Sequence, residues 1–160
     1  LSPKIQKAAE FLSPAYGGEM LDIGTNKGYF PYVLRDKFVN ILGVDNDEKC
    51  IEEALGQYSA PNVYFGVVNL KRYSDEKFLV RRSQADVVTL LAMTHHIANA
   101  GLTDNFLKVL PNLSRKWILI EEITDIAKYN FALSNAGFKR VKSISSIPAD
   151  RTLALWEKQK

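Results

Sequence analysis

Strand-like and helical segments alternate along most of this 160-residue chain, and this alternation limits the possible folds more than any other feature of the sequence. Short apolar runs with the character of buried strands occupy residues 20–23, 41–44, 63–68, 86–91 and 117–120. Segments with helical character lie between them. This order predicts a mostly parallel sheet with helices on both faces, the doubly wound α/β architecture.

The C-terminal part of the chain breaks the alternation. Residues 138–144 and 152–156 both read as strands, and only Ser145 to Arg151 join them. A parallel connection needs a crossover of about a dozen residues or more, so these two strands are expected to pair antiparallel. The expected fold is a three-layer α/β/α arrangement, in which a seven-stranded, mostly parallel sheet ends in a C-terminal antiparallel hairpin.

Capping residues mark several helix starts. Ser2 is a suitable N-cap, and Pro3 behind it suits the first helical position. Thr103 and Thr124 are expected to cap two later helices. Helices are predicted at residues 4–12, 29–38, 47–57, 74–82, 103–110 and from 124 to just before Gly137.

Length and composition fit one domain, expected over residues 1–160. The net charge of +3 permits an anionic partner without requiring one, because nucleic-acid binding needs basic residues clustered on one face. Cys50 is the single cysteine, which excludes an intrachain disulfide and a Cys-based zinc site. No segment resembles a signal peptide and the apolar runs are too short to span a bilayer, so a cytoplasmic location without membrane contact is expected.

A glycine-bearing loop between the first expected strand and the next helix, residues 21–30, is the strongest local signal in the chain. Gly24 and Gly28 lie at this turn, where a backbone without Cβ atoms can approach a ligand closely. The next strand ends in Asp45, about twenty residues after Gly24, as in folds whose acidic residue binds ribose hydroxyls. A dinucleotide fingerprint requires a third glycine where this chain has Tyr29, so the spacing disfavours NAD.

The segment from Asp22 to Gly28 resembles the D/E-x-G-x-G-x-G motif of class I methyltransferases. Asn26 stands where the motif has its middle glycine. Asparagine tolerates positive φ better than other residues with a side chain, so the turn is expected to form. The order of seven strands with a terminal hairpin also resembles this family over essentially the whole chain.

The resemblance implies an S-adenosylmethionine-dependent methyltransferase that acts on an oxygen or nitrogen nucleophile, with residues 1–16 forming an N-terminal helix beside the cofactor pocket. By similarity, Asp22, Gly24 and Gly28 border the methionine part of S-adenosylmethionine, and Asp45 accepts hydrogen bonds from both ribose hydroxyls. Asn69 matches the residue that faces the adenine amino group, and its amide oxygen can accept a hydrogen bond from that group. The other expected cofactor contacts are Thr25, Asn26, Tyr29, Asn46, Leu70, Leu91 and Ala92.

Candidate catalytic residues follow the fourth and fifth expected strands, because ligands in open α/β sheets bind beyond the carboxyl ends of the strands. His95 and His96 can each remove a proton from a nucleophile, and the sequence does not distinguish them; their alternative role is to cap or pack the loop. One of Glu121 and Glu122 is expected to contact the substrate, and Glu122 is the candidate catalytic residue. The E-x-x-E-H-H spacing of metal-dependent RNA 3′-end methyltransferases is absent, so no metal is expected.

Basic residues do not identify the methyl acceptor. Basic pairs at 81–82, 115–116 and 139–140 precede expected strands and therefore belong to the edge opposite the active site. Four cations are expected on the catalytic side: Lys27, Lys71, Arg72 and Arg151. A small-molecule substrate is favoured, while an RNA or protein substrate stays open, as does a site completed by a partner subunit or a further domain.

Two other functions fit parts of the pattern. The chain could be a noncatalytic cofactor-binding or scaffold domain, which would bind S-adenosylmethionine without turnover. It could also be an NAD-binding oxidoreductase, which the glycine spacing disfavours and which cofactor binding would distinguish.

Overall fold

The computed structural model describes residues 1–71, 84–145 and 150–160. Within these ranges, seven strands form one sheet in the order β3-β2-β1-β4-β5-β7-β6. The strands are β1 (Glu19–Ile23), β2 (Asn40–Asp45), β3 (Val63–Val67), β4 (Ala85–Leu90), β5 (Ser114–Glu122), β6 (Phe138–Ser145) and β7 (Thr152–Lys158). The helices are α1 (Pro3–Phe11), α2 (Tyr29–Val33), α3 (Glu48–Gln57), α5 (Thr94–Asn99), α6 (Thr103–Val109) and α7 (Ile126–Asn135), with short 3₁₀ turns at Ser13–Ala15 and Leu110–Asn112.

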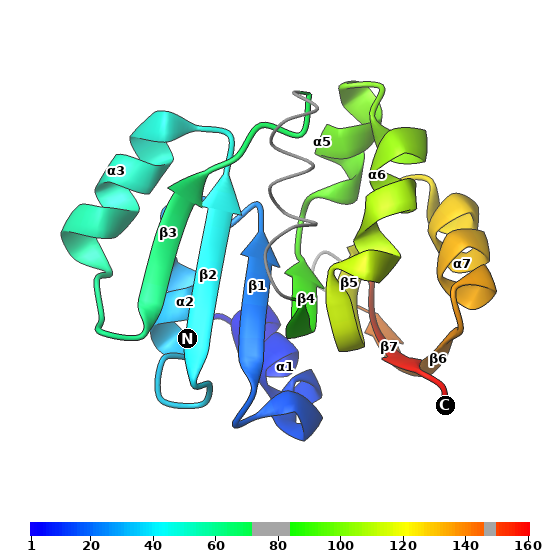
Figure 1. The fold of residues 1–160 in the computed structure, drawn as a ribbon, viewed down its shortest axis with the longest axis horizontal. Coiled ribbons are helices and arrows are strands. Elements are labelled where there is room, and N and C mark those ends of the chain that lie inside the picture. The colour runs from blue at the N-terminus through cyan, green and yellow to red at the C-terminus, as the bar shows by residue number, and fades with distance from the viewer. Residues whose placement is uncertain (72–83, 146–149) are drawn as a thin grey trace.

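Strands β1 to β5 pair in parallel, whereas β7 pairs antiparallel with both β5 and β6. The predicted seven-stranded sheet with a C-terminal antiparallel hairpin is therefore confirmed. Figure 1 shows the carboxyl ends of β1, β2 and β3 pointing to the same edge of the sheet. Strand β1 pairs with both β2 and β4, so the chain direction across the sheet reverses at β1, and a crevice forms at such a reversal.

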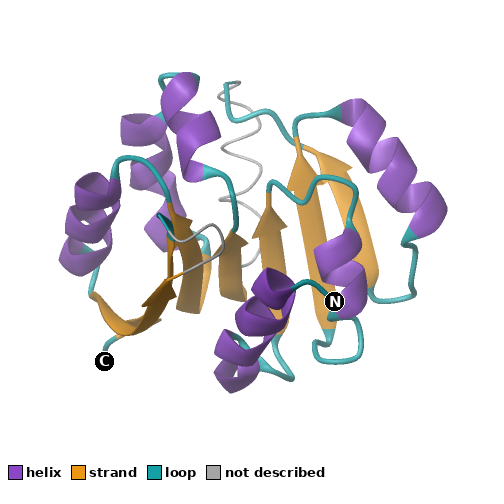
Figure 2. Ribbon diagram, turned by 180° about the vertical axis from the view of Figure 1, so that it is seen from behind, coloured by secondary structure: helices purple, strands orange, loops and turns teal. Residues whose placement is uncertain are grey.

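Helices cover both faces of the sheet, as Figures 1 and 2 show from opposite sides, and two apolar cores lie between them and the sheet. On one face, α5, α6 and α7 pack through Ile97, Phe106 and Leu133. On the other face, α1 and α2 pack through Phe11 and Phe30. Since buried parallel strands need helices on both sides, this arrangement explains the apolar character of the central strands.

Ser2 and Pro3 begin α1 as predicted: the Ser2 hydroxyl accepts a hydrogen bond from the Ile5 amide at 3.2 Å. The helix predicted at 29–38 is shorter, because α2 ends at Val33. Helix α5 was not expected, since its six residues are too few to show a helical periodicity. The helix predicted at 74–82 lies outside the described residues.

The predicted threonine caps are wrong. Thr103 is the first residue of α6 rather than its cap, and its hydroxyl donates to Asp125 Oδ2 at 2.8 Å. Asp125 is the N-cap position of α7, with φ of 57°, and its side chain caps no amide there. Thr124 instead donates its amide to Thr94 Oγ1 at 3.1 Å, which ties the end of β5 to the start of α5.

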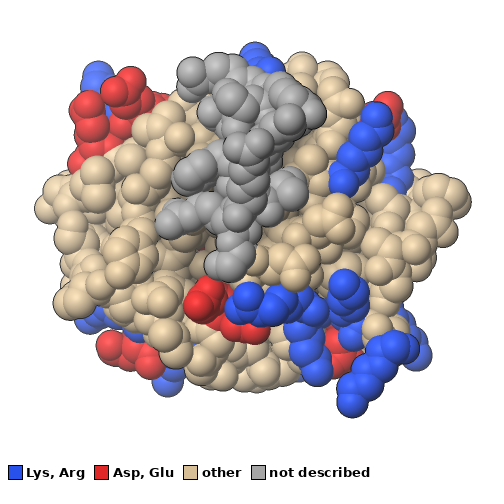
Figure 3. Space-filling model, in the orientation of Figure 1, with Lys and Arg blue, Asp and Glu red and all other residues tan. Residues whose placement is uncertain are grey.

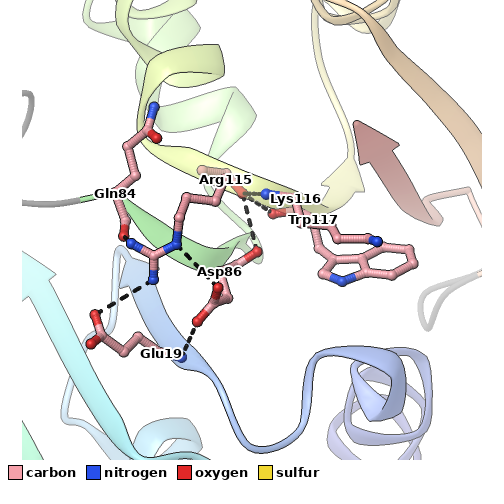
Figure 4. Close-up of polar contacts among 7 residues, drawn as sticks. Glu19, Gln84, Asp86, Arg115, Lys116 and Trp117 are labelled. Carbon is pink, nitrogen blue, oxygen red and sulfur yellow. Dashed lines mark hydrogen bonds and ion pairs between the residues drawn. The ribbon is translucent and has the colours of Figure 1, made fainter. Parts of the chain in front are cut away.

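The opposite edge of the sheet, where β1, β4 and β5 begin, is held by Asp86 (Figure 4). Asp86 Oδ2 accepts the Glu19 amide at 2.7 Å, and Oδ1 accepts Arg115 Nε at 3.1 Å. The hydrogen bond from Arg115 holds the pKa of Asp86 below its usual range. This cluster joins three strands at their first or second residues.

Basic side chains lie along the same edge. Figure 3 shows Lys and Arg side chains gathered where β5 begins and where β6 and β7 lie. The exposed basic residues at the starts of β5 and β6 are Arg115, Lys116, Lys139 and Arg140. In the part of the chain that the structure describes, no helix has the length and apolar character needed to cross a membrane.

Candidate active site

A cavity of about 720 Å³ lies at the carboxyl ends of β1 to β4. This volume is within the usual range for small-molecule sites, about 300–1,000 Å³. Most of the predicted cofactor residues line it: Asp22, Gly24, Thr25, Asn26, Tyr29, Asp45, Asn46, Asn69, Leu70, Leu91 and Ala92. Lys4 and Ile5 of α1 line it as well, so the N-terminal helix borders this cavity.

The glycine loop is held against β2 by two backbone hydrogen bonds. The amides of Gly24 and Thr25 both donate to the Val44 carbonyl, each at 2.9 Å. Asn26 has a φ of 54°, which confirms that asparagine takes the left-handed conformation at the motif's middle position. The loop therefore keeps its turn without the central glycine.

Gly28 is absent from the cavity lining, although it was predicted to border the cofactor. It has a φ of 83°, and a Cβ there would lie 2.6 Å from Phe65 Cζ and 2.8 Å from Ala54 Cβ. Glycine is thus required for the close approach of α2 to β3 and α3. The role of Gly28 is to bring the start of α2 into place rather than to face the cavity.

Asp45, at the tip of β2, is fixed by two backbone amides. Its Oδ2 accepts the Asn26 amide at 2.8 Å, and its Oδ1 accepts the Asp47 amide at 3.0 Å. A carboxylate offers about four lone-pair positions, so each oxygen keeps capacity for a further donor. The geometry gives an oriented pair of acceptors on the cavity wall.

Asp22 is buried at the end of β1, where it lines the cavity floor. Burial raises its pKa to about 6, although a hydrogen bond from Thr89 acts in the opposite direction. Thr89 Oγ1 donates to Asp22 Oδ1 at 2.6 Å. Burial therefore makes this carboxyl group costly to ionise. A cation bound nearby would favour its charged form.

The far wall of the cavity is formed after β3 and at the start of α3. Asn69 Oδ1 accepts the Lys71 amide at 2.9 Å, so the side chain predicted to face adenine also shapes its own turn. Asp47 caps α3 by accepting the Lys49 amide at 3.0 Å, and the Cys50 thiol donates to Asn26 Oδ1 at 3.3 Å. Asp47 and Cys50 line the cavity, and sequence reasoning missed both because a cap and a lone cysteine carry no motif.

A strained turn joins β4 to α5. Ala92 has a φ of 53°, unusual for a residue with a Cβ. Its amide donates to Glu121 Oε1 at 2.8 Å, which holds the turn in this conformation. The Met93 side chain packs directly on Gly24: a Cβ on Gly24 would lie 2.2 Å from the Met93 sulfur.

His95 and His96 occupy the first turn of α5, and their ring centroids are 4.0 Å apart. His96 lines the cavity and is exposed. His95 does not line it; its Nδ1 is buried and has no hydrogen-bond partner among the described residues. Burial lowers the pKa of His95, and the neighbouring His96 lowers it further.

Glu121 and Glu122 point to opposite faces of the sheet, since successive strand residues alternate. Glu122 does not line the cavity; its Oε1 lies 2.6 Å from Arg140. Burial raises the pKa of the Glu122 carboxyl group. Glu121 is the acid beside the active site. It is fully buried and lies 2.7 Å from Lys4 Nζ and 3.7 Å from Arg151.

Of the four predicted cations, Lys27 and Lys71 line the cavity. Lys71 lines the far wall, and Lys27 lies 3.4 Å from Glu53 of α3. Arg151 lies beside Glu121, and Arg72 lies outside the described residues. Among the described side chains, no group of three His, Cys, Asp or Glu residues is arranged to hold a metal ion.

A family model described as a methyltransferase domain matches residues 1–125. The chain belongs to this family of methyltransferase domains. The predicted family is thus confirmed, and the methyltransferase domain includes the glycine loop, Asp45 and both histidines. Among curated proteins, none matches the chain in sequence.

Solved structures share the fold. The N-methyltransferase NodS from Bradyrhizobium japonicum WM9 has a TM-score of 0.76 at 10% identity, covering 98% of this chain and 94% of its own. Magnesium protoporphyrin IX methyltransferase from Synechocystis PCC 6803, with bound S-adenosylmethionine, scores 0.75 at 14% identity, covering 97% and 78%. Sp1610 of Streptococcus pneumoniae, a candidate tRNA (m1A22) methyltransferase, scores 0.71 at 18% identity, covering 100% and 72%.

Proposed function

We propose that this methyltransferase domain binds S-adenosylmethionine in the cavity above β1 to β4 and transfers its methyl group to an oxygen or nitrogen atom of an acceptor. The observation that carries the proposal is the setting of Asp45. Its carboxylate lines the cavity and is oriented by the Asn26 and Asp47 amides. Each oxygen can still accept a hydrogen bond from a ligand. Two adjacent ribose hydroxyls are the donors that such a carboxylate fits.

The residues present suit this cofactor in size and charge. The cavity of about 720 Å³ accommodates a nucleoside joined to an amino acid. Asp22, Asp45 and Asp47 line one end, where they would attract a cationic cofactor. When bound, S-adenosylmethionine supplies a methyl group on a sulfonium, which is a good leaving group.

The histidines are proposed to handle the proton of the acceptor. His96 borders the cavity and is the residue that would meet the nucleophile. His95 lies against it with the ring centroids 4.0 Å apart, and burial lowers the pKa of His95. A neutral imidazole at this position can accept a proton as the acceptor is methylated. Glu122 is not proposed for catalysis, because it faces Arg140.

Calorimetric titration with S-adenosylmethionine, S-adenosylhomocysteine and NAD tests the donor. We expect micromolar binding of the first two and none of NAD. Binding of NAD alone would support an oxidoreductase instead. Failure of both adenosyl compounds to bind would remove the basis of the proposal.

Once an acceptor is known, His96→Ala and His95→Ala separate the two histidines. Loss of the proton acceptor is expected to lower kcat about 10²–10⁴-fold in His96→Ala. His95→Ala is expected to change the pH profile with a smaller loss of kcat, because His95 acts through its neighbour. An equal loss in both variants, or a larger one in His95→Ala, would reverse these roles.

A further inference from the structure

We infer that the methyl acceptor carries an anionic group, a carboxylate or a phosphate, which Arg151 and Lys4 hold beside the two histidines. This inference rests on the proposed function, because it assigns the opposite end of the same site. The relevant cluster, here called the Glu121 cluster, consists of Lys4, Glu121 and Arg151. It joins α1, the end of β5 and the start of β7, which are far apart in the sequence.

Charge is divided between the two ends of the active site. The end formed by β1, β2 and α3 carries three carboxyl groups: Asp22, Asp45 and Asp47. In the Glu121 cluster, two cations flank one carboxylate, which leaves one positive charge in excess. A cationic cofactor and an anionic acceptor would therefore be drawn to different ends of one site.

Burial within the Glu121 cluster decides which charges an incoming molecule meets. The Glu121 side chain is 0% exposed, whereas those of Lys4 and Arg151 are 24% and 26% exposed. The acid therefore lies beneath the two cations. A ligand that approaches from solvent contacts positive groups and is shielded from the carboxylate.

Glu121 also orients the two cations. Its Oε1 lies 2.7 Å from Lys4 Nζ and 3.7 Å from Arg151, while accepting the Ala92 amide at 2.8 Å. A guanidinium has five N–H donors and an ammonium has three, so one buried carboxylate leaves donors on both for a second anion. Arginine in particular binds carboxylate and phosphate through two parallel hydrogen bonds.

The cluster lies close to the histidines. Arg151 and Lys4 both act electrostatically on His95, where they lower its pKa in addition to the larger effect of burial. Lys4 and His96 line the same cavity. An anionic group held by the cluster would therefore place the rest of a small acceptor at His96.

Nucleic acid is the less favoured source of this anion. The exposed basic residues Arg115, Lys116 and Lys139, at the starts of β5 and β6, lie at the edge of the sheet opposite the cavity. A polyanion needs many such contacts for affinity. Lys4, which lines the cavity, and Arg151, which lies beside Glu121, suit a single carboxylate or phosphate on a small molecule.

Titration of the full chain with inorganic phosphate and, separately, malonate tests the inference, with the imidazole signals of His95 and His96 followed by NMR. Sodium chloride at equal ionic strength is the reference. We expect saturable shifts at millimolar concentrations, and the better of the two anions identifies the acceptor class. Arg151→Gln is expected to weaken binding at least tenfold, and Lys4→Gln is expected to weaken it as well.

Lys139→Gln removes an equal charge at the opposite edge and is the matched control, which should bind as the wild type does. The inference is overturned if neither anion shifts the histidines beyond chloride, or if Arg151→Gln, with its backbone spectrum unchanged, binds equally well. The titration is run with and without S-adenosylhomocysteine. Anion binding without S-adenosylhomocysteine binding would contradict the proposed function alone, and the reverse result would contradict this inference alone.

Discussion

Glu121 accepts the Ala92 amide at 2.8 Å, and this bond joins the end of β5 to the turn between β4 and α5. Ala92 has a φ of 53°, a conformation that costs a residue with a Cβ about 1–3 kcal/mol and persists only where neighbouring contacts impose it. The same Glu121 oxygen lies 2.7 Å from Lys4. One buried carboxylate therefore supports the turn before the histidines and orients the cations of the Glu121 cluster.

Glu121→Gln separates these two roles. The amide oxygen of Gln can still accept the Ala92 bond, but the charge that pairs with Lys4 and Arg151 is lost. We expect the free energy of unfolding, measured in urea, to fall by about 1–3 kcal/mol. The loss is limited because the two cations are partly exposed and water can hydrate them. Glu10→Gln, which removes an exposed partner of Lys7, should change it by less than about 0.5 kcal/mol. An equal effect in both variants would show that Glu121 has no special role.

Asp22→Asn tests the cost of a buried carboxyl group in the site. The pKa of Asp22 is raised from 3.8 to about 6 in the folded protein, so the folded state binds the proton more tightly than the unfolded state. Wild-type stability should therefore fall as the pH rises from about 4 to about 6 and stay lower above that, by roughly 3 kcal/mol at most. Asn keeps an acceptor for Thr89 and should remove this slope.

Cofactor affinity should change in the opposite sense. At pH 7.5, Asp22→Asn should unfold at higher urea concentration yet bind S-adenosylmethionine more weakly, because a carboxylate facing a cation has been lost. Unfolding curves and calorimetry at pH 4.5 and pH 7.5 provide both quantities. A variant with the wild-type pH slope would contradict the assigned pKa.

Gly24→Ala tests the contact between the glycine loop and Met93. A Cβ at Gly24 would lie 2.2 Å from the Met93 sulfur, and the φ of 78° disfavours alanine as well. We expect a loss of about 1–3 kcal/mol in the free energy of unfolding and a large loss of S-adenosylmethionine affinity.

Gly24→Ala combined with Met93→Ala should recover part of the stability, because the steric conflict is removed. Gly56→Ala is the control: a Cβ there meets nothing within 4 Å, and Gly56 lies inside α3. It should leave binding unchanged and stabilise the protein by about 0.5–1 kcal/mol. Loss of binding in the control would point to a general sensitivity to substitution.

Asp86→Asn tests the edge opposite the active site. The pKa of Asp86 is lowered mainly by the hydrogen bond from Arg115, so its ionised form contributes stability above pH 4 that is lost as the pH falls through the folded pKa. The side chains are partly exposed and screened by solvent, so we expect a loss of only about 0.5–1 kcal/mol. Unfolding and calorimetry should show this loss at pH 7, a smaller one at pH 3, and unchanged S-adenosylmethionine affinity.

Local sequence chemistry was enough to predict much of the fold and the cofactor side of the site. The short connection between β6 and β7 predicted the hairpin, and the residue type at Asn26 predicted its positive φ. Asp45 could be identified because a strand end, a glycine loop and a spacing of about twenty residues all belong to one local unit.

The acceptor side depends on contacts between distant parts of the chain, which the sequence does not encode locally. Lys4 and Arg151 come from opposite ends of the sequence and meet only at Glu121. The alternation of strand residues places Glu121 and Glu122 on opposite faces of the sheet but does not tell which face each takes. The sequence therefore predicts Glu122 as the catalytic residue, whereas the structure pairs Glu122 with Arg140.

The most direct test of the central claim is calorimetric titration of S-adenosylmethionine into the wild type, Asp45→Ala and the control Asp36→Ala, which removes an exposed carboxylate near the opposite edge. Loss of two charge-assisted hydrogen bonds predicts at least tenfold weaker binding in Asp45→Ala, while Asp36→Ala should match the wild type. Wild-type affinity in Asp45→Ala would contradict the assignment of Asp45 to the ribose, and absence of binding in the wild type would contradict the proposed function itself.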